Sequence, residues 1–202
     1  MLTRRFLMVL GGFLLIAPPA ARAAVLTFAM EGPITFKDDP VGLLDFAEVG
    51  DRVVYTFSFD TDAPDTHGAP TLAVYDGIAS SVLVGDRQLS SGQPLISIQE
   101  HDLFQVFSDV AMPEGVSRIA FTLHDRDLVA ILTKALPEEP YGLEPFEDKE
   151  FDFVLDMPPV PPDTIFTRFE FYGDIDRFYI VPEPATAVLV CLGLTAVIRK
   201  RR

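Results

Sequence analysis

Cysteine is almost absent from this chain of 202 residues. The one cysteine, Cys191, lies in an apolar run near the C-terminus, where it serves as a small apolar filler. The long middle part of the chain, residues 24–180, contains none. We therefore expect no disulfide, no thiol catalysis and no cysteine-ligated metal there, and its stability has to come from packing.

Positive charge is scarce in the same middle part. The chain has 16 Lys and Arg against 30 Asp and Glu, but seven of the cations and one of the acids lie in the two terminal segments. Nine cations and 29 acids remain for residues 24–180, a net charge of about −20. This balance argues against nucleic acid and anionic membrane surfaces as partners, because both require cations.

Catalytic motifs are missing as well. The histidines His67, His101 and His124 lie in no His-Glu-x-x-His pattern, and no Gly-x-Ser-x-Gly elbow occurs. Glu138 and Glu139 are sequence neighbours, which does not place them across a cleft at the about 5–10 Å that glycosidases need. We therefore expect a protein that is not an enzyme.

Tryptophan is absent too, which weakens a carbohydrate-binding interpretation that relies on large aromatic platforms. Tyr141, Tyr172 and Tyr179 could take that role. Core packing explains Tyr172 and Tyr179 equally well.

Short strands separated by turns fill residues 24–180. In the clearest, residues 53–59, Val53, Tyr55, Phe57 and Phe59 share one face. Further strands are expected at residues 25–30, 34–37, 78–84, 87–89, 95–99, 103–107, 116–123, 128–132, 151–155, 167–172 and 178–181. This spacing predicts a single all-β domain, an antiparallel β-sandwich of the jelly-roll or immunoglobulin-like kind.

Three segments depart from this strand pattern. Residues 127–135 are the one candidate for a short helix, as an alternative to a strand. Residues 136–150 are acidic and contain prolines, which predicts a long solvated loop. Residues 157–163 are expected to form a polyproline II connector between two strands.

The N-terminus has the pattern of a secretory signal peptide. Arg4 and Arg5 precede an apolar stretch at residues 6–17, and Ala21-Arg22-Ala23 fits the small-x-small rule of signal peptidase. We predict cleavage after Ala23, so that the mature chain starts at Ala24. A retained anchor is the alternative, but the run is shorter than the about 20 residues that a span requires. The general secretion route is favoured over the twin-arginine route.

The C-terminus combines three features in its last 22 residues. Val181, Pro182, Glu183 and Pro184 come first, an apolar run follows at residues 187–198, and the chain ends in Arg199, Lys200, Arg201 and Arg202. The prolines resist helix and keep the segment before the run extended. The apolar run predicts a single transmembrane helix, and the terminal cations should stay on the cytoplasmic side of the membrane.

This tail resembles the PEP-CTERM sorting signal of bacterial exosortase substrates, with Val181-Pro182-Glu183-Pro184 as the motif. The resemblance implies cleavage near the motif by an exosortase, a membrane cysteine protease for which Glu183 would be substrate. It also implies a Gram-negative bacterium that makes exopolysaccharide and a biofilm or floc matrix. An ordinary tail anchor behind a proline-rich linker is the alternative.

The middle part is also similar to a loose group of secreted β-rich proteins that carry the same tail. The matching segments are residues 26–28, 38–40 with Leu43, 49–51, 55–60 and 62–65, followed by Tyr75 and residues 78–84. The group has no activity that could be carried over. The similarity therefore supports only the fold and the compartment.

Three carboxylates, Asp60, Asp62 and Asp65, follow directly on the strand at residues 53–59. Calcium prefers such oxygen ligands, and Asp76 or Asp38-Asp39 could approach them in space. The spacing is not that of an EF-hand, because Pro64 interrupts it. Asp is also a common turn residue, so a solvated turn is the alternative to a calcium site.

Together these observations predict a non-enzymatic exported protein with a structural or adhesive role at the cell surface or in the extracellular matrix. Its expected partners are signal peptidase, an exosortase and exopolysaccharide, and it would reside transiently in the inner membrane through its C-terminal helix. Two alternatives remain open: a secreted hydrolase acting on polysaccharide, and a calcium-dependent glycan-binding module.

Overall fold

Eleven β-strands and no helix make up the part of the chain that the computed structural model describes, residues 24–113, 115–157 and 167–182. The strands are β1 (Val25–Asp38), β2 (Arg52–Asp60), β3 (Leu72–Asp76), β4 (Ala79–Val84), β5 (Arg87–Leu89), β6 (Leu95–Gln99), β7 (Leu103–Ala111), β8 (Val116–His124), β9 (Asp148–Met157), β10 (Thr167–Asp174) and β11 (Arg177–Ile180). The expected all-β, antiparallel architecture is confirmed.

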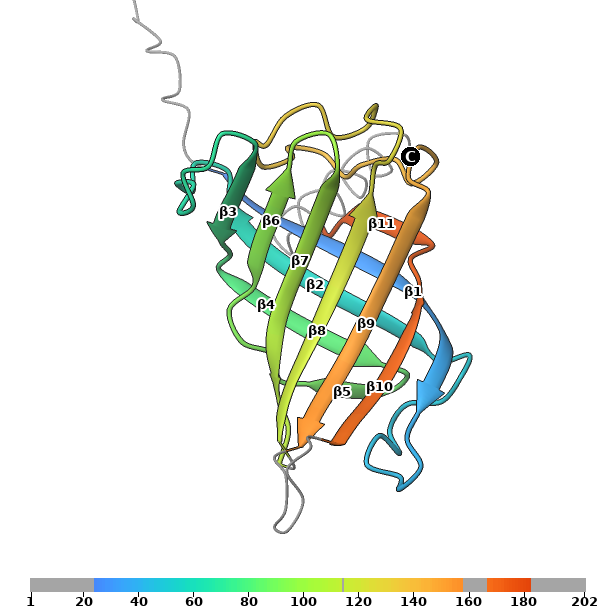
Figure 1. Ribbon diagram of the computed structural model, residues 1–202. Helices are drawn as coiled ribbons and strands as arrows, with labels where there is room; N and C mark the ends of the chain where they lie inside the picture. Colours follow the sequence, from blue (N-terminus) through green and yellow to red (C-terminus); the bar gives the residue numbers. More distant parts are fainter. Residues whose placement is uncertain (1–23, 114, 158–166, 183–202) are drawn as a thin grey trace, which may run out of the picture.

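All eleven strands belong to one antiparallel sheet. Its order is β3-β6-β7-β8-β9-β10-β1-β2-β4-β5, with β11 beside β1 (Figure 1). Strands β6 to β10 are neighbours both along the chain and across the sheet, so this half is a meander. Jelly-roll and immunoglobulin-like sandwiches use Greek-key connections instead. The order of β6 to β10 differs from a Greek key, because each strand pairs with the strand that precedes it in the sequence.

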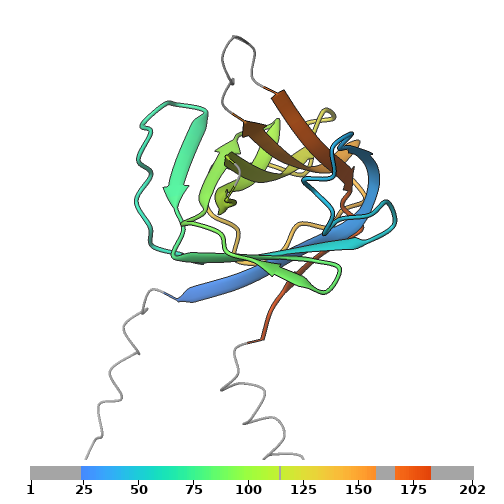
Figure 2. The same ribbon diagram turned by 90° about the horizontal axis from the view of Figure 1, so that it is seen from below.

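Strand β1 is shared by the two halves of the sheet. Its residues 25–33 pair with β2, and its residues 34–38 pair with β10, with a register shift between Ile34 and Phe36. At this shift the sheet folds over on itself. Figures 1 and 2 show the result: the half with β6–β10 faces the half with β2, β4 and β5, and the strands of the two halves cross. The predicted strands at residues 25–30 and 34–37 are thus one bent strand.

Two glycines allow the chain to pass closely at this fold-over. A Cβ atom on Gly32 would lie 1.8 Å from the carbonyl oxygen of Asp174, and one on Gly173 would lie 1.9 Å from the carbonyl oxygen of Pro33. No side chain fits at such distances. Pro33 is the last residue of the β2-paired part of β1, next to the register shift, a position that suits a residue without a backbone N–H.

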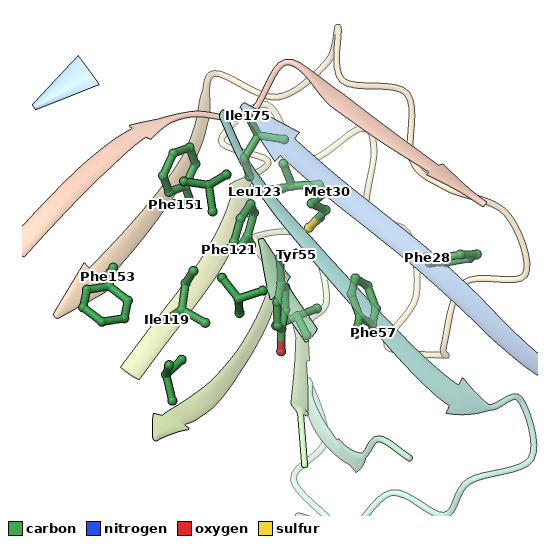
Figure 3. Packing of buried hydrophobic residues seen from close by; sticks show 14 of the residues in the cluster. Phe28, Met30, Tyr55, Phe57, Ile119, Phe121, Leu123, Phe151, Phe153 and Ile175 are labelled. Carbon is green, nitrogen blue, oxygen red and sulfur yellow. The ribbon is translucent and has the colours of Figure 1, made fainter. Parts of the chain in front are cut away.

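The core between the two halves is rich in aromatic rings. On β2, Val53, Tyr55, Phe57 and Phe59 all point inward and are fully buried, as their alternation predicted. The Tyr55 ring stacks on Phe121 of the facing half at 5.2 Å between centroids, and Phe121 stacks on Phe151 at 5.1 Å (Figure 3). These stacks join the two halves in a body without cysteine.

The segment after β8 is neither helix nor strand. Residues 126 and 127 form a turn, the rest of residues 125–135 is irregular, and Leu128 adopts a left-handed conformation with φ of 60°. The buried Asp125 explains this local structure, because its carboxylate accepts hydrogen bonds from the backbone N–H groups of Val129, Ala130 and Ile131. The predictions of a helix at residues 127–135 and of a strand at residues 128–132 were both wrong.

The predicted solvated loop at residues 136–150 is only partly solvated. Phe146 is buried, and the Tyr141 ring packs edge-on against Phe104 at 5.3 Å. Strand β9 begins at Asp148, within the predicted loop. Strand β3 has no counterpart among the predicted strands.

Several predicted segments lie outside the described residues. They are the signal peptide at residues 1–23, most of the polyproline connector, and the tail from Glu183 to Arg202. Within the described ranges, no helix has the length and apolar character that a membrane span needs.

Substituting Gly173 tests the fold-over. We expect Gly173→Ala to lower the free energy of unfolding by about 3 kcal/mol, because the new methyl group meets the Pro33 carbonyl and the Phe151 ring. Chemical denaturation of the purified body, residues 24–182, measures the change. Gly142→Ala is the matched control, since its Cβ would meet nothing within 4 Å. Equal stability of the two variants would contradict the close passage of β1 and β10.

Candidate functional site

Both ends of the described chain lie at the same end of β1. Strand β11 runs antiparallel to the first part of β1, with Phe28 opposite Ile180 and Glu31 opposite Arg177. The Val181 N–H then donates a 2.8 Å hydrogen bond to the carbonyl oxygen of Thr27. On the other side of β1, beside β2, the Ala24 N–H donates to the Thr61 hydroxyl at 3.2 Å.

This arrangement brings together the described members of the two predicted processing sites. Ala24 follows the predicted signal peptidase site, and Val181 and Pro182 open the predicted sorting motif. The remaining residues of these sites lie outside the described residues: Ala21, Ala23, Glu183, Pro184, Arg199, Lys200, Arg201 and Arg202.

A charged network fastens the start of β11 to β1 and β2. The Glu31 side chain is only 9% exposed and forms ion pairs with Arg177 at 3.0 Å and with Arg52 at 3.2 Å. Arg52 also donates two hydrogen bonds to Asp176, at 2.6 and 3.1 Å. This contact is the main cause that raises the pKa of Arg52. The charges therefore hold β11 from its outer side.

Aromatic packing holds the middle of the same strand. The Phe178 ring lies 5.4 Å from Phe28, edge to face, and 5.9 Å from Phe104. A hollow of about 600 Å³ borders β11, lined by Tyr141, Gly142, Leu143, Asp176, Arg177, Phe178 and Tyr179. Among the described strands, β11 pairs with β1 alone.

The predicted calcium ligands do not converge. Asp60 accepts a hydrogen bond from the N–H of Asp62 at 2.9 Å, which closes a turn. One Asp65 oxygen accepts from the N–H groups of His67 and Val74, and the other pairs with Lys134 at 3.1 Å. The described ranges contain no group of three His, Cys, Asp or Glu side chains placed to hold a metal ion.

Asp65 instead covers the open edge of β3. It occupies the Val74 N–H, while the N–H of Thr66 donates to the Val74 carbonyl at 2.8 Å. Unpaired backbone groups on an edge strand invite association with other chains. The loop thus supplies hydrogen-bond partners for the backbone of β3 at this edge. The hydrogen bonds that Asp65 accepts from the backbone N–H groups of His67 and Val74, in this order of importance, lower its pKa.

The outer face of the meander carries a second candidate surface that the sequence reasoning missed. A hollow of about 400 Å³ is lined by Asp109, Ser117, Arg118, Asp152, Val154, Asp156 and Arg168. The two arginines pair with carboxylates: Arg118 with Asp109 at 3.4 Å and Arg168 with Asp156 at 3.1 Å.

Asp152 is the central carboxylate of this hollow. Burial raises its pKa, and the charges of Glu150 and Glu170 raise it further. The alternation of β9 indicates this position, because Asp152, Val154 and Asp156 alternate with the buried Phe151, Phe153 and Leu155.

A row of mostly apolar side chains crosses five strands beside this hollow. The register places Phe107, Ala120, Asp152, Tyr172 and Phe36 side by side. At one end the Phe36 and Tyr172 rings stack at 4.7 Å, although they are 40% and 44% exposed. At the other end the Arg118 guanidinium lies 5.2 Å from the centre of the Phe107 ring.

Comparisons with family models, curated proteins and solved structures gave no match for this chain. The interpretation of these surfaces therefore rests on the chain's own residues.

The depressed pKa of Asp65 predicts how acid acts on the β3 edge. Because the pKa is lower in the folded chain, the charged carboxylate stabilises the fold above its unfolded pKa of about 4, and this contribution disappears as the pH falls below that value. We expect Asp65→Asn to flatten the fall in unfolding midpoint between pH 5 and pH 2, measured by urea denaturation.

Asp62→Asn is the matched control for this experiment. It removes a carboxylate from the same loop, where only the backbone N–H of Asp62 takes part in the turn. If both substitutions change the pH profile equally, Asp65 affects stability only through the net charge of the loop and not through its hydrogen bonds.

Proposed function

We propose that this chain is a non-enzymatic exported bacterial protein, sorted by an exosortase to the cell surface or the extracellular matrix. Its folded body would act there as a structural or adhesive module, a two-layer sandwich stabilised by aromatic packing. The tail motif Val181-Pro182-Glu183-Pro184 and the signal peptide pattern ending at Ala23 motivate this proposal. The excess of acid keeps the released body soluble.

The pairing of β1 with β11 is the structural observation that supports the proposal most. It brings Ala24 and Val181 to the same end of β1, so that both predicted processing sites would leave the body on one side. Five residues, 182–186, separate Val181 from the apolar run. At about 3.4 Å per extended residue they reach at most about 17 Å. A body tethered this closely would present its motif at the membrane surface.

Intact mass spectrometry tests the proposed sorting. The protein would be recovered from the medium and from the membranes of its native host, with and without the exosortase. We expect the medium to contain a chain that runs from Ala24 to near Pro182, and this species should disappear without the exosortase. A chain that retains Arg199–Arg202 and occurs only in membranes would overturn the sorting proposal in favour of a permanent anchor.

The outer face of the meander favours glycan binding as a second candidate function. Its row of five side chains spans four strand spacings, about 19 Å, which would accommodate several linked sugar rings. The exposed parts of Phe36 and Tyr172, whose rings stack on each other, suit apolar contact with sugar rings. The adjacent arginines and carboxylates offer donors and acceptors for hydroxyl groups. The surrounding acidic residues favour a neutral glycan over an acidic one.

The same groups favour binding over hydrolysis. A glycosidase needs an acid and a second carboxylate that acts as base or nucleophile. Burial raises the pKa of Asp152, as an acid requires, but the carboxylates of Asp109 and Asp156 are engaged by Arg118 and Arg168, which a substrate would have to displace before either could act as base or nucleophile. Calcium binding at the loop after β2 has less support than glycan binding, since one oxygen of Asp65 accepts a hydrogen bond from Val74 and the other pairs with Lys134.

Tyr172→Ala tests the glycan surface. The probe is the neutral fraction of the extracellular polysaccharide from the native host, separated from the acidic fraction on an anion exchanger. We expect the body to bind this fraction and the substitution to weaken binding about tenfold, through the lost stacking surface. Calorimetry measures the affinity, with Leu132→Ala, an exposed apolar residue of the loop after β8, as control. Binding of the acidic fraction alone, or unchanged binding by Tyr172→Ala, would exclude this surface.

A further inference from the structure

The pairing of the last strand continues up to the predicted sorting motif. Ile180 is opposite Phe28, and the next residue, Val181, still donates its N–H to Thr27. Val181 is also the first residue of the motif. Pro182 is therefore the only described motif residue beyond the last hydrogen bond to β1.

A protease that reads this motif needs the same backbone groups. Peptide-binding proteins commonly take an extended segment as an added strand and hydrogen-bond its main chain. For cleavage near Pro182, the segment before the cleaved bond is residues 178–181. In the folded body these residues are paired with β1 and so are already part of a sheet.

The strand is short enough to detach without opening the rest of the body. It spans four residues and is held on one side only by β1 among the described strands. Tyr179 and Ile180 are 38% and 41% exposed. Short edge elements with few buried contacts open at a lower free energy than the whole fold. The Glu31–Arg177 ion pair and the Phe178 ring are the contacts that such an opening would break.

We infer that β11 is a detachable strand that controls cleavage of the tail: the protease acts on the state in which residues 178–181 have separated from β1. This inference rests on the proposed sorting function and adds a regulatory step to it. The fold of the body thereby sets how fast the protein is released. The charged network around Glu31 determines how often the strand separates.

Weakening the strand tests the inference in the native host, with the full chain and its exosortase. Arg177→Gln removes the ion pair to Glu31 and should speed release of the body about threefold, the effect of one partly exposed ion pair on the population of the open state. Release is followed by intact mass after a pulse of synthesis. Arg126→Gln is the matched control, because it removes an ion pair between an equally exposed arginine and Asp148, at the start of β9.

A reversible lock provides the opposite test. Ala29 and Tyr179 are directly opposite in the register of β1 and β11, so the pair Ala29→Cys and Tyr179→Cys can form a disulfide across the two strands. We expect the oxidised double variant to accumulate uncleaved and to be released once a reductant is added. Each single cysteine variant controls for the substitutions themselves.

The outcomes separate the inference from the proposed function. If the unaltered chain is never cleaved in the presence of the exosortase, the sorting proposal fails. If it is cleaved, and the locked variant is cleaved at the same rate, then β11 need not detach and the inference is overturned. An unchanged release rate for Arg177→Gln would likewise count against it.

Discussion

The close passage of β1 and β10 at Gly32 and Gly173 is the constraint on which the rest of the structure depends. A Cβ atom at either position would overlap a backbone carbonyl of the neighbouring strand. Because the backbones meet this closely, β1 can leave β2 and continue along β10, and the single sheet folds over. The fold-over is what places Tyr55 of one half against Phe121 of the other. Without it, each half would expose one apolar face to water.

The same strand links the fold to the ends of the chain. β1 pairs with β2 on one side and with β11 and β10 in turn on the other. The position of β11 follows from this arrangement, because β10 has moved away from the first part of β1 and leaves its edge open. The last strand fills that edge and carries the chain back toward Ala24. A feature required by the core thus also decides where both chain ends leave the body.

Most strands and their inward faces could be predicted from local patterns, with β3 missed and a false strand placed at residues 128–132, while the arrangement of the strands could not. Alternation identified the buried face of β2 because every second residue is large and apolar. The fold-over depends on Gly173 meeting Ile34, two residues far apart in the sequence that no local pattern connects. The role of Asp65 was missed for the same reason, since its partner Lys134 is 69 residues away. The predicted sorting motif differs from these cases, because its residues are consecutive; it remains a prediction.

Hydrogen exchange of the backbone amides tests most directly whether β1 organises both the fold and the chain ends. The account predicts three classes in the purified body. The amides shared by β1 and β2 should exchange only through global unfolding, and those shared by β1 and β11, including Val181, should exchange faster but remain protected. The amides of the exposed loop residues Glu138 and Glu139, which donate no hydrogen bond within the described part of the chain, should exchange freely. Unprotected amides in β11 would contradict the pairing of the chain ends, and protection equal to that of β2 would contradict a strand that detaches by itself.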